Sequence, residues 1–183
     1  LGTEFALLEQ NAPDSLWNQL IDNVSSVYTG ILTYDMNWGS LDVQAPAWMR
    51  NPHLKMIGIS AYSPLVNTQE RVDPSKINAL WKTTVQPQLD NFARELGKPI
   101  FLSEVGYPNS EYALYQPWNS SINAPADPQE QAAATDAALT NSIADPHILG
   151  AFVWGWDNTG DFNLSNAPAA TSVIYTHYKS LQS

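Results

Sequence analysis

The sequence contains no cysteine among its 183 residues. This excludes disulfide bridges, thiolate metal sites and cysteine nucleophiles, and it leaves the compartment of the protein undetermined. Basic residues are scarce as well, since eight Lys and Arg stand against 18 Asp and Glu and give a formal net charge of −10. So acidic a chain offers no basic patch for phosphates or anionic lipids, and neither nucleic acid nor a membrane is expected as a partner.

Long apolar segments are also missing. No run of 18 apolar residues occurs, so no transmembrane helix is expected. The first five residues lack the basic start and the apolar stretch of a signal peptide. They are typical of the end of a buried strand instead, and we expect earlier strands of the same fold to precede Leu1.

Aromatic residues, in contrast, are abundant, with seven Trp and eight Tyr. Aromatic faces pack in cores, and they also stack on nucleobases or on sugar rings. Because the negative charge argues against nucleic acid, a neutral polymer such as a polysaccharide is the partner that best fits this composition.

Four apolar runs of strand length stand out at residues 30–38, 56–62, 99–107 and 148–156, and residues 1–5 form the end of a fifth. Each run ends in polar or aromatic residues. Near-continuous apolar runs are typical of parallel strands that are covered on both faces of the sheet.

Helical patterns with recognisable caps separate these runs. A helix is expected over residues 15–27, with an apolar stripe formed by Leu16, Leu20, Val24 and Val27. A second begins after the cap residue Asp73 and ends near residue 97. A break is expected in it at Pro87, because proline cannot donate the helical hydrogen bond.

A further helix is expected from Asp127 to about residue 143, with Pro128 at its first position and Glu130 placed as in a capping box. Residues 167–181 are typical of a closing helix, and residues 46–49 of a short one. Strands that alternate with helices predict an α/β fold with a parallel sheet, in one domain of residues 1–183.

Two architectures of this class compete, the open doubly wound sheet and the closed (β/α)₈ TIM barrel. No glycine-rich phosphate loop follows any strand, which argues against the nucleotide-binding open sheet. Polar residues at the carboxyl ends of the strands favour the barrel, whose active sites lie there. Five strands are visible where a barrel needs eight, so the chain would be the C-terminal part of a barrel with three N-terminal strands absent. The alternatives are an N-terminal half on a separate chain, a truncated sequence, or a fold other than a barrel.

Two glutamates, Glu4 and Glu104, each stand where an apolar strand meets polar residues. A carboxylate at such a place is costly unless its surroundings stabilise it or use it, so a structural ion pair is one interpretation. Two such residues at the ends of two strands favour a catalytic interpretation, because glycoside hydrolysis needs one carboxylic acid and one carboxylate.

Five segments in chain order carry a family resemblance. They are Gly2-Thr3-Glu4; Trp17 with Tyr28-x-Gly30-x-Leu32-Thr33-Tyr34 and Asn37-Trp38; Ile57-Gly58-Ile59-Ser60-Ala61-Tyr62-x-Pro64-Leu65; Glu104-Val105-Gly106-Tyr107; and Trp154-x-Trp156. Together they resemble the retaining (β/α)₈ glycoside hydrolases, and more closely glycoside hydrolase family 113, the β-1,4-mannanases. The matches cover strands 4 to 8 of that fold, which would place strands 1 to 3 before Leu1.

The resemblance implies that Glu4 is the acid/base and Glu104 the nucleophile of a retaining reaction. An ionised Glu104 needs hydrogen-bond donors, and the Tyr62 hydroxyl is the candidate, although a tyrosine in the core would have the same sequence pattern. The activity implied is cleavage of β-1,4-mannosidic bonds in mannan or manno-oligosaccharides. The alternatives are another retaining β-glycanase of the same clan, acting on β-glucan, and a non-catalytic carbohydrate-binding barrel.

Further residues are candidates for binding the sugar. Asn37 and Trp38 close one strand, where Asn37 either bonds a sugar hydroxyl or forms a turn before Gly39. Trp154 and Trp156 alternate with a glycine and are expected on one face of the last strand, with Trp154 the stronger candidate for stacking.

The loops beyond strands 7 and 8 add other candidates, namely Trp118, Asp157, Asn158 and Asp161. The three histidines, His53, His147 and His177, are scattered without metal-ligand spacing, and the chemistry requires neither metal nor cofactor. The expected partners are a polysaccharide or oligosaccharide substrate and a separate N-terminal half of the same barrel.

Overall fold

The computed structural model describes residues 1–156 and 160–181. Its strands are β1 (Asp35–Asn37), β2 (Ile57–Ser60), β3 (Ile100–Val105) and β4 (Ile148–Val153). Its α-helices are α1 (Ala6–Asn11), α2 (Asp14–Val27), α3 (Pro74–Thr84), α4 (Gln86–Leu96), α5 (Pro128–Ala144) and α6 (Pro168–Ser180). Three short 3₁₀ helices complete the described elements. After β1 come η1 (Trp38–Ser40) and η2 (Ala47–Arg50), both before β2, and η3 (Leu164–Asn166) follows β4.

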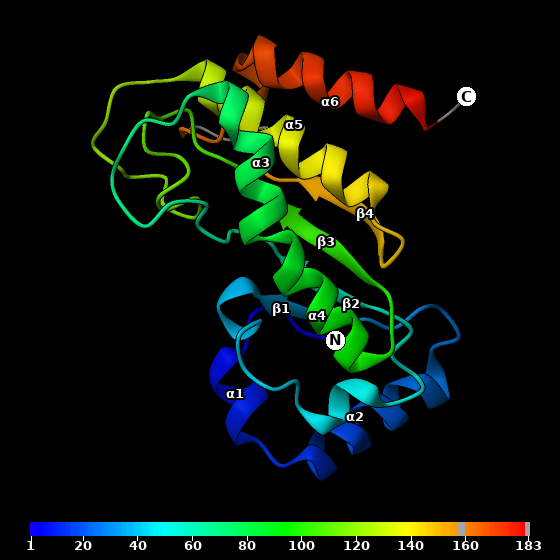
Figure 1. The fold of residues 1–183 in the computed structure, drawn as a ribbon. Coiled ribbons are helices and arrows are strands. Elements are labelled where there is room, and N and C mark those ends of the chain that lie inside the picture. The colour runs from blue at the N-terminus through cyan, green and yellow to red at the C-terminus, as the bar shows by residue number, and fades with distance from the viewer. Residues whose placement is uncertain (157–159, 182–183) are drawn as a thin grey trace.

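The strands form one parallel sheet in the order β1-β2-β3-β4 (Figure 1). Thr3 adds a parallel bridge to Asp35 on the free side of β1, which confirms that residues 1–5 continue the sheet. The α/β class with a parallel sheet is therefore confirmed. The strand expected over residues 30–38 is mostly irregular, because Leu32 bridges to Leu54 and regular pairing with β2 begins only at Asp35.

The two faces of the sheet differ in composition. Ile57, Ile59 and Leu102 are buried in the main hydrophobic core, together with side chains of α3 and α4. The opposite face carries Gly58, Ser103 and the ring of Phe101, since a side chain added at Gly58 would meet both the Ser103 hydroxyl and the Phe101 ring. Consecutive parallel strands joined by right-handed crossovers place their helices on one face, which leaves the second face without a helix layer from these crossovers.

The helix expected between residues 74 and 97 is divided into α3 and α4, which meet at Val85. Pro87 lies in the first turn of α4, where its missing N–H has no helical partner to lose, so the predicted break is confirmed. Gly97 ends α4 with φ of 65°, a left-handed conformation that glycine adopts without a Cβ clash.

The start of α5 departs from the prediction in one respect. Asp127 caps the helix as expected and accepts the N–H groups of Gln129 and Glu130 at 3.1 and 3.0 Å. Glu130 does not turn back to close a capping box; its Oε2 accepts the N–H of Val72 at 3.0 Å instead. Because that buried N–H lies in an irregular loop, it needs an acceptor from outside its own segment.

The predicted apolar stripe of α2 is wrong for three of its four members. Leu16, Leu20 and Val27 are exposed, and the helix buries Trp17 and Ile21 instead. The Trp17 ring stacks on Trp48 with centroids 4.3 Å apart. Burial of this large ring fixes the rotation of the helix about its axis.

Both free sides of the sheet carry exposed apolar side chains. On the side of Thr3 these include Leu16 and Leu20, and on β4 they include Leu149 and Phe152, exposed by 58% and 66%. Among the described helices, none has the length and hydropathy needed to cross a membrane.

Candidate active site

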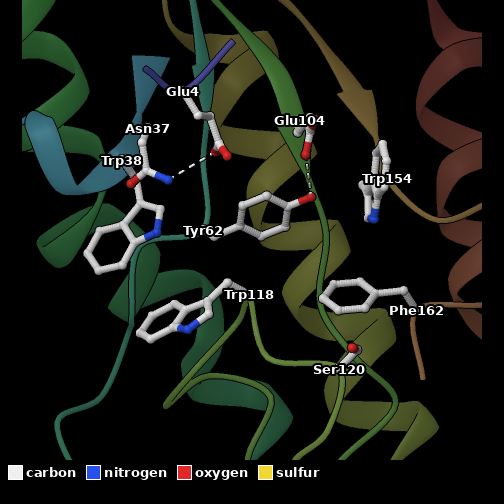
Figure 2. A pocket seen from close by; sticks show the side chains of 9 residues that line it. All are labelled: Glu4, Asn37, Trp38, Tyr62, Glu104, Trp118, Ser120, Trp154 and Phe162. Atoms are coloured by element: carbon white, nitrogen blue, oxygen red, sulfur yellow. Dashed lines mark hydrogen bonds between the residues drawn. The ribbon is translucent and has the colours of Figure 1, made fainter. Parts of the chain in front are cut away.

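The two glutamates singled out in the sequence open into one cavity at the carboxyl ends of the strands (Figure 2). The cavity has a volume of about 500 Å³, within the range of small-molecule sites. Its lining combines two carboxylates with aromatic rings and few other polar groups. The lining residues are Glu4, Asn37, Trp38, Tyr62, Glu104, Trp118, Ser120, Trp154 and Phe162.

Glu104 reaches the cavity because β3 bulges at its carboxyl end. Leu102 pairs with Ile59, but the next residue of β2, Ser60, pairs with Glu104, so Ser103 is an extra residue on β3. In a regular strand, neighbouring side chains point to opposite faces. The bulge lets Ser103 point toward the sheet interior while Glu104 lines the cavity.

The Glu104 carboxylate is held by Tyr62, whose hydroxyl donates to Oε2 at 2.8 Å. This contact confirms the predicted hydrogen bond. Burial raises the pKa of Glu104, the bond from Tyr62 lowers it, and the charge of Asp35 raises it further, with a net rise from the ordinary value. The same desolvation and the adjacent carboxylate raise the pKa of Tyr62, so its hydroxyl keeps the proton that it donates.

Glu4 stands on a strained backbone at the edge of the sheet. Its φ is 54°, which no other non-glycine residue shares among those that the structure describes. Its N–H donates to the Asp35 carbonyl at 2.9 Å, and its Oε1 accepts from Asn37 Nδ2 at 3.0 Å. Asn37 also accepts from the Gly39 N–H at 2.8 Å, so the turn proposed for it is present, and its bond to a sugar hydroxyl stays a prediction.

A third carboxylate, Asp35, lies near these two. Its oxygens accept from the hydroxyls of Ser60 and Ser103, with the Ser60 contact at 3.1 Å. Burial raises the pKa of Asp35, and the two hydroxyls partly oppose that rise. The carboxylate therefore joins β1, β2 and β3 at the level of the bulge and adds a negative charge near Glu104.

Aromatic rings form much of the remaining wall. Trp38 stacks on Trp118 with centroids 5.0 Å apart and planes inclined by 26°. Trp154 lines the opposite side of the cavity in Figure 2 and is 47% exposed. Phe162 packs edge-on against Tyr62 at 6.2 Å. Exposed ring faces beside carboxylates suit a ligand with both apolar and hydroxyl surfaces, such as a sugar.

Trp156 does not join this wall. β4 ends at Val153, and Gly155 has φ of 96°, so the expected alternation of Trp154 and Trp156 on one strand face is wrong. Trp156 is 55% exposed and is not among the residues that line the cavity. Gly155 is required by space as well, since an added Cβ would lie 2.7 Å from Phe162.

The loop candidates have different outcomes. Trp118 lines the cavity, whereas Asp161 does not. Asp157 and Asn158 lie outside the described residues. Phe162 and Ser120 also line the cavity but lie in loops without a sequence motif, and only their position beyond a strand that carries site residues could have indicated them.

All three histidines lie near a carboxylate, and His147 lies near two. The His147 ring lies 3.3 Å from Asp90 and 3.4 Å from Asp145, at the amino-terminal end of β4 and away from the cavity. Asp145 also accepts the His147 backbone N–H and a hydrogen bond from Gln86. These bonds account for the cluster as a structural link between α4 and the turn before β4.

A parallel α/β sheet that brings two carboxylates and several aromatic rings into one cavity is typical of glycoside hydrolases. The chain belongs to Glycoside Hydrolase Family 113, whose family model matches residues 1–179. No curated protein sequence matches the chain.

Solved structures of that family share the fold. The β-mannanase AaManA from Alicyclobacillus acidocaldarius, in complex with ManMIm, is 22% identical with a TM-score of 0.71, over 97% of this chain and 54% of its own. Two further structures of a GH113 β-1,4-mannanase, one a complex, are 21% and 20% identical with TM-scores of 0.73 and 0.75, over 98% of this chain and 54% of theirs. The chain thus spans about half the length of these proteins.

Proposed function

We propose that the chain carries the catalytic carboxylates of a retaining β-1,4-mannanase, with Glu104 as nucleophile and Glu4 as acid/base. The observation that carries the proposal is the shared cavity, in which Glu104 is fixed by Tyr62 and Glu4 by Asn37. Membership in the family supports the reaction class, and the names of the solved relatives support mannan as the substrate.

In the first step of the proposed reaction, a Glu104 oxygen attacks C1 of the sugar. The bond from C1 to the leaving oxygen breaks, and Glu4 transfers its proton to that oxygen. In the second step Glu4 removes a proton from water, the water oxygen attacks C1, and the bond to Glu104 breaks. Glu4 ends protonated and Glu104 ionised, as both began.

The sugar would lie against Trp154, whose exposed face borders the same cavity as Glu104. Trp38 and Trp118 would form the wall on the side of Glu4. Aromatic faces bind the apolar side of a pyranose, while the carboxylates and Asn37 meet its hydroxyls.

We further propose that the four-stranded sheet with Thr3 is the strand 4 to 8 portion of a (β/α)₈ barrel. The sequential strand order and the apolar side chains exposed on both free sides support this closure, as does the half-length match to solved relatives. A complementary segment with strands 1 to 3 would cover Leu149 and Phe152 on one side and Leu16 and Leu20 on the other. Binding of that segment to the 183-residue chain, with gain of mannan hydrolysis, would support closure; no binding would contradict it.

The test of the reaction is hydrolysis of β-mannan with proton NMR of the first-formed anomer. A retaining enzyme releases the β-anomer first, and an inverting enzyme the α-anomer. Glu104→Gln and Glu4→Gln should each lower kcat/KM on mannan by at least about 1,000-fold, because each removes a group that acts in the transition state. Glu70→Gln is the matched control, since Glu70 is exposed and lies outside the cavity.

A loss of less than about tenfold in Glu104→Gln would refute the nucleophile assignment. Release from β-glucan but not from mannan would keep the mechanism and replace the substrate. Carbohydrate binding without any hydrolysis, by the wild type combined with the segment that carries strands 1 to 3, would favour a non-catalytic protein.

A further inference from the structure

A buried pair outside the cavity, Glu9 and Tyr34, is joined to the backbone beside Glu4. Glu9 is 1% exposed and Tyr34 is fully buried, and neither lines the cavity. The Tyr34 hydroxyl donates to Glu9 Oε1 at 2.7 Å and accepts the Phe5 N–H at 2.9 Å. Ser40 donates to the other oxygen of Glu9 at 3.1 Å, so both carboxylate oxygens have donors.

The Glu9 carboxylate fixes the direction in which the Tyr34 hydroxyl donates. A phenol hydroxyl carries one proton and can rotate it toward any acceptor nearby. Because the hydroxyl proton of Tyr34 points to Glu9, the lone pairs of the Tyr34 oxygen face the Phe5 N–H. Burial raises the pKa of Tyr34 and the carboxylate raises it further, so the hydroxyl stays protonated in this position.

Phe5 matters because it follows the strained residue. Glu4 has φ of 54°, a conformation that costs a non-glycine residue on the order of 1 kcal/mol or more. Such strain persists only where the surroundings hold it. The Glu4 N–H is bound to the Asp35 carbonyl at 2.9 Å, and the next N–H, of Phe5, is bound to Tyr34. The two bonds fix the peptide groups on both sides of the Glu4 Cα.

Aromatic packing holds the Tyr34 ring in place. The Tyr34 ring meets Trp17 and Trp48 edge-on at 5.5 and 5.0 Å. Trp17 and Trp48 stack on each other, and both are buried in the main core. The hydroxyl therefore has a fixed position relative to the sheet, and the first turn of α1, which carries Glu9, is tied to the same point.

We propose that Glu9 and Tyr34 are positioning residues for Glu4: they hold its strained backbone so that its carboxyl group points into the cavity. This inference rests on the proposed role of Glu4 as acid/base. A poorly placed acid matters most when the leaving group needs a proton. It matters little when the leaving group departs readily as an anion. A comparison of the two kinds of substrate therefore distinguishes a misplaced acid from a general loss of activity.

The experiment compares Tyr34→Phe with wild type on manno-oligosaccharides and on a 2,4-dinitrophenyl β-mannoside. The inference predicts a fall in kcat/KM of about 10- to 100-fold on the oligosaccharide and of less than about threefold in the glycosylation step of the dinitrophenyl substrate. Tyr107→Phe is the matched control, because it removes another buried hydroxyl, bound to Trp81 Nε1 at 3.0 Å, away from Glu4. The control should leave the ratio of the two substrates unchanged.

A second variant and a second readout keep the test independent of activity. Glu9→Gln retains an acceptor for Tyr34 and should show the same selectivity with a smaller loss. Amide hydrogen exchange at Phe5 should accelerate at least about tenfold in Tyr34→Phe and stay unchanged in Tyr107→Phe.

Equal losses on both substrates, or unchanged exchange at Phe5, would overturn the positioning role. A wild type that hydrolyses neither substrate when combined with the segment that carries strands 1 to 3 would refute the proposed function instead. In that case the exchange at Phe5 alone still decides whether Tyr34 holds the backbone beside Glu4.

Discussion

The hydroxyl of Tyr62 donates to Oε2 of Glu104 over 2.8 Å, from the segment just after β2 to the neighbouring strand β3. Burial raises the pKa of Glu104, this bond lowers it, and the charge of Asp35 raises it again. The carboxylate is thus under opposing influences, and two single substitutions should move its pKa in opposite directions.

Tyr62→Phe should raise the pKa of Glu104, because it removes a hydrogen bond to the ionised form. A nucleophile must be ionised, so the acid limb of kcat/KM should move to higher pH. Loss of a hydrogen bond to a charged group should also lower kcat/KM at the optimum by about 10- to 100-fold. A pH profile of mannan hydrolysis measures both effects, and an acid limb left in place would contradict the role of Tyr62.

Asp35→Asn should have the opposite effect on the same limb. It removes a negative charge that raises the pKa of Glu104, so the ionised nucleophile should persist to lower pH. The asparagine oxygen can still accept from Ser60 or Ser103, which limits damage to the sheet. The acid limb is measured as for Tyr62→Phe; a shift to higher pH would show that Asp35 acts on Glu104 by some means other than its charge.

Trp154→Ala should weaken the reaction far more than Trp156→Ala. Trp154 lines the cavity, whereas Trp156 is equally large and exposed but lies outside it. Removing the ring that contacts the apolar side of the sugar should lower kcat/KM by about 10-fold or more, as is usual when a buried Trp contact is truncated. Steady-state kinetics on mannopentaose compares the two, and equal losses would place the sugar elsewhere.

Gly155→Ala should destabilise the protein and disturb the cavity wall. A Cβ there would lie 2.7 Å from both the Cβ and the carbonyl oxygen of Phe162, on a backbone with φ of 96°. The expected loss is about 1–3 kcal/mol of unfolding free energy, together with a lower kcat/KM. Gly150→Ala is the control, because open space surrounds that position. Denaturant unfolding of both variants tests the expectation, which fails if they are equally stable.

Glu130→Gln should change how stability depends on pH. Burial raises the pKa of Glu130 to about 7, while the Val72 N–H opposes that rise. The folded state therefore favours the protonated acid. Its contribution to stability is fully present below the ordinary pKa of 4.5 and is lost as the pH rises toward 7.

The neutral glutamine of Glu130→Gln should remove this loss, which amounts to about 3 kcal/mol at most. Thermal unfolding between pH 4.5 and 7.5 should show a decline in Tm for the wild type and a flatter curve for the variant. Parallel curves would show that Glu130 does not titrate in this range.

Much of the architecture follows from local sequence signals. Pro87 divides a helix, Asp127 begins one and Gly97 ends one, because each acts through its own backbone geometry within a few residues. Glu4 and Glu104 were recognisable for a related reason, since a carboxylate that interrupts an apolar strand is costly without a use. These features needed no knowledge of the partners across the sheet.

Other features depend on residues far apart in the chain, and no local pattern contains them. Glu130 accepts the N–H of Val72 rather than closing the capping box of its own helix. The contact of Trp17 with Trp48 sets the rotation of α2. The bulge that turns Glu104 into the cavity exists only in the register of β3 with its neighbours. The sequence thus determined which residues are candidates for the chemistry and the order of the elements. Tertiary packing decided where those residues point, because orientation is set by contacts that form only when the strands and helices meet.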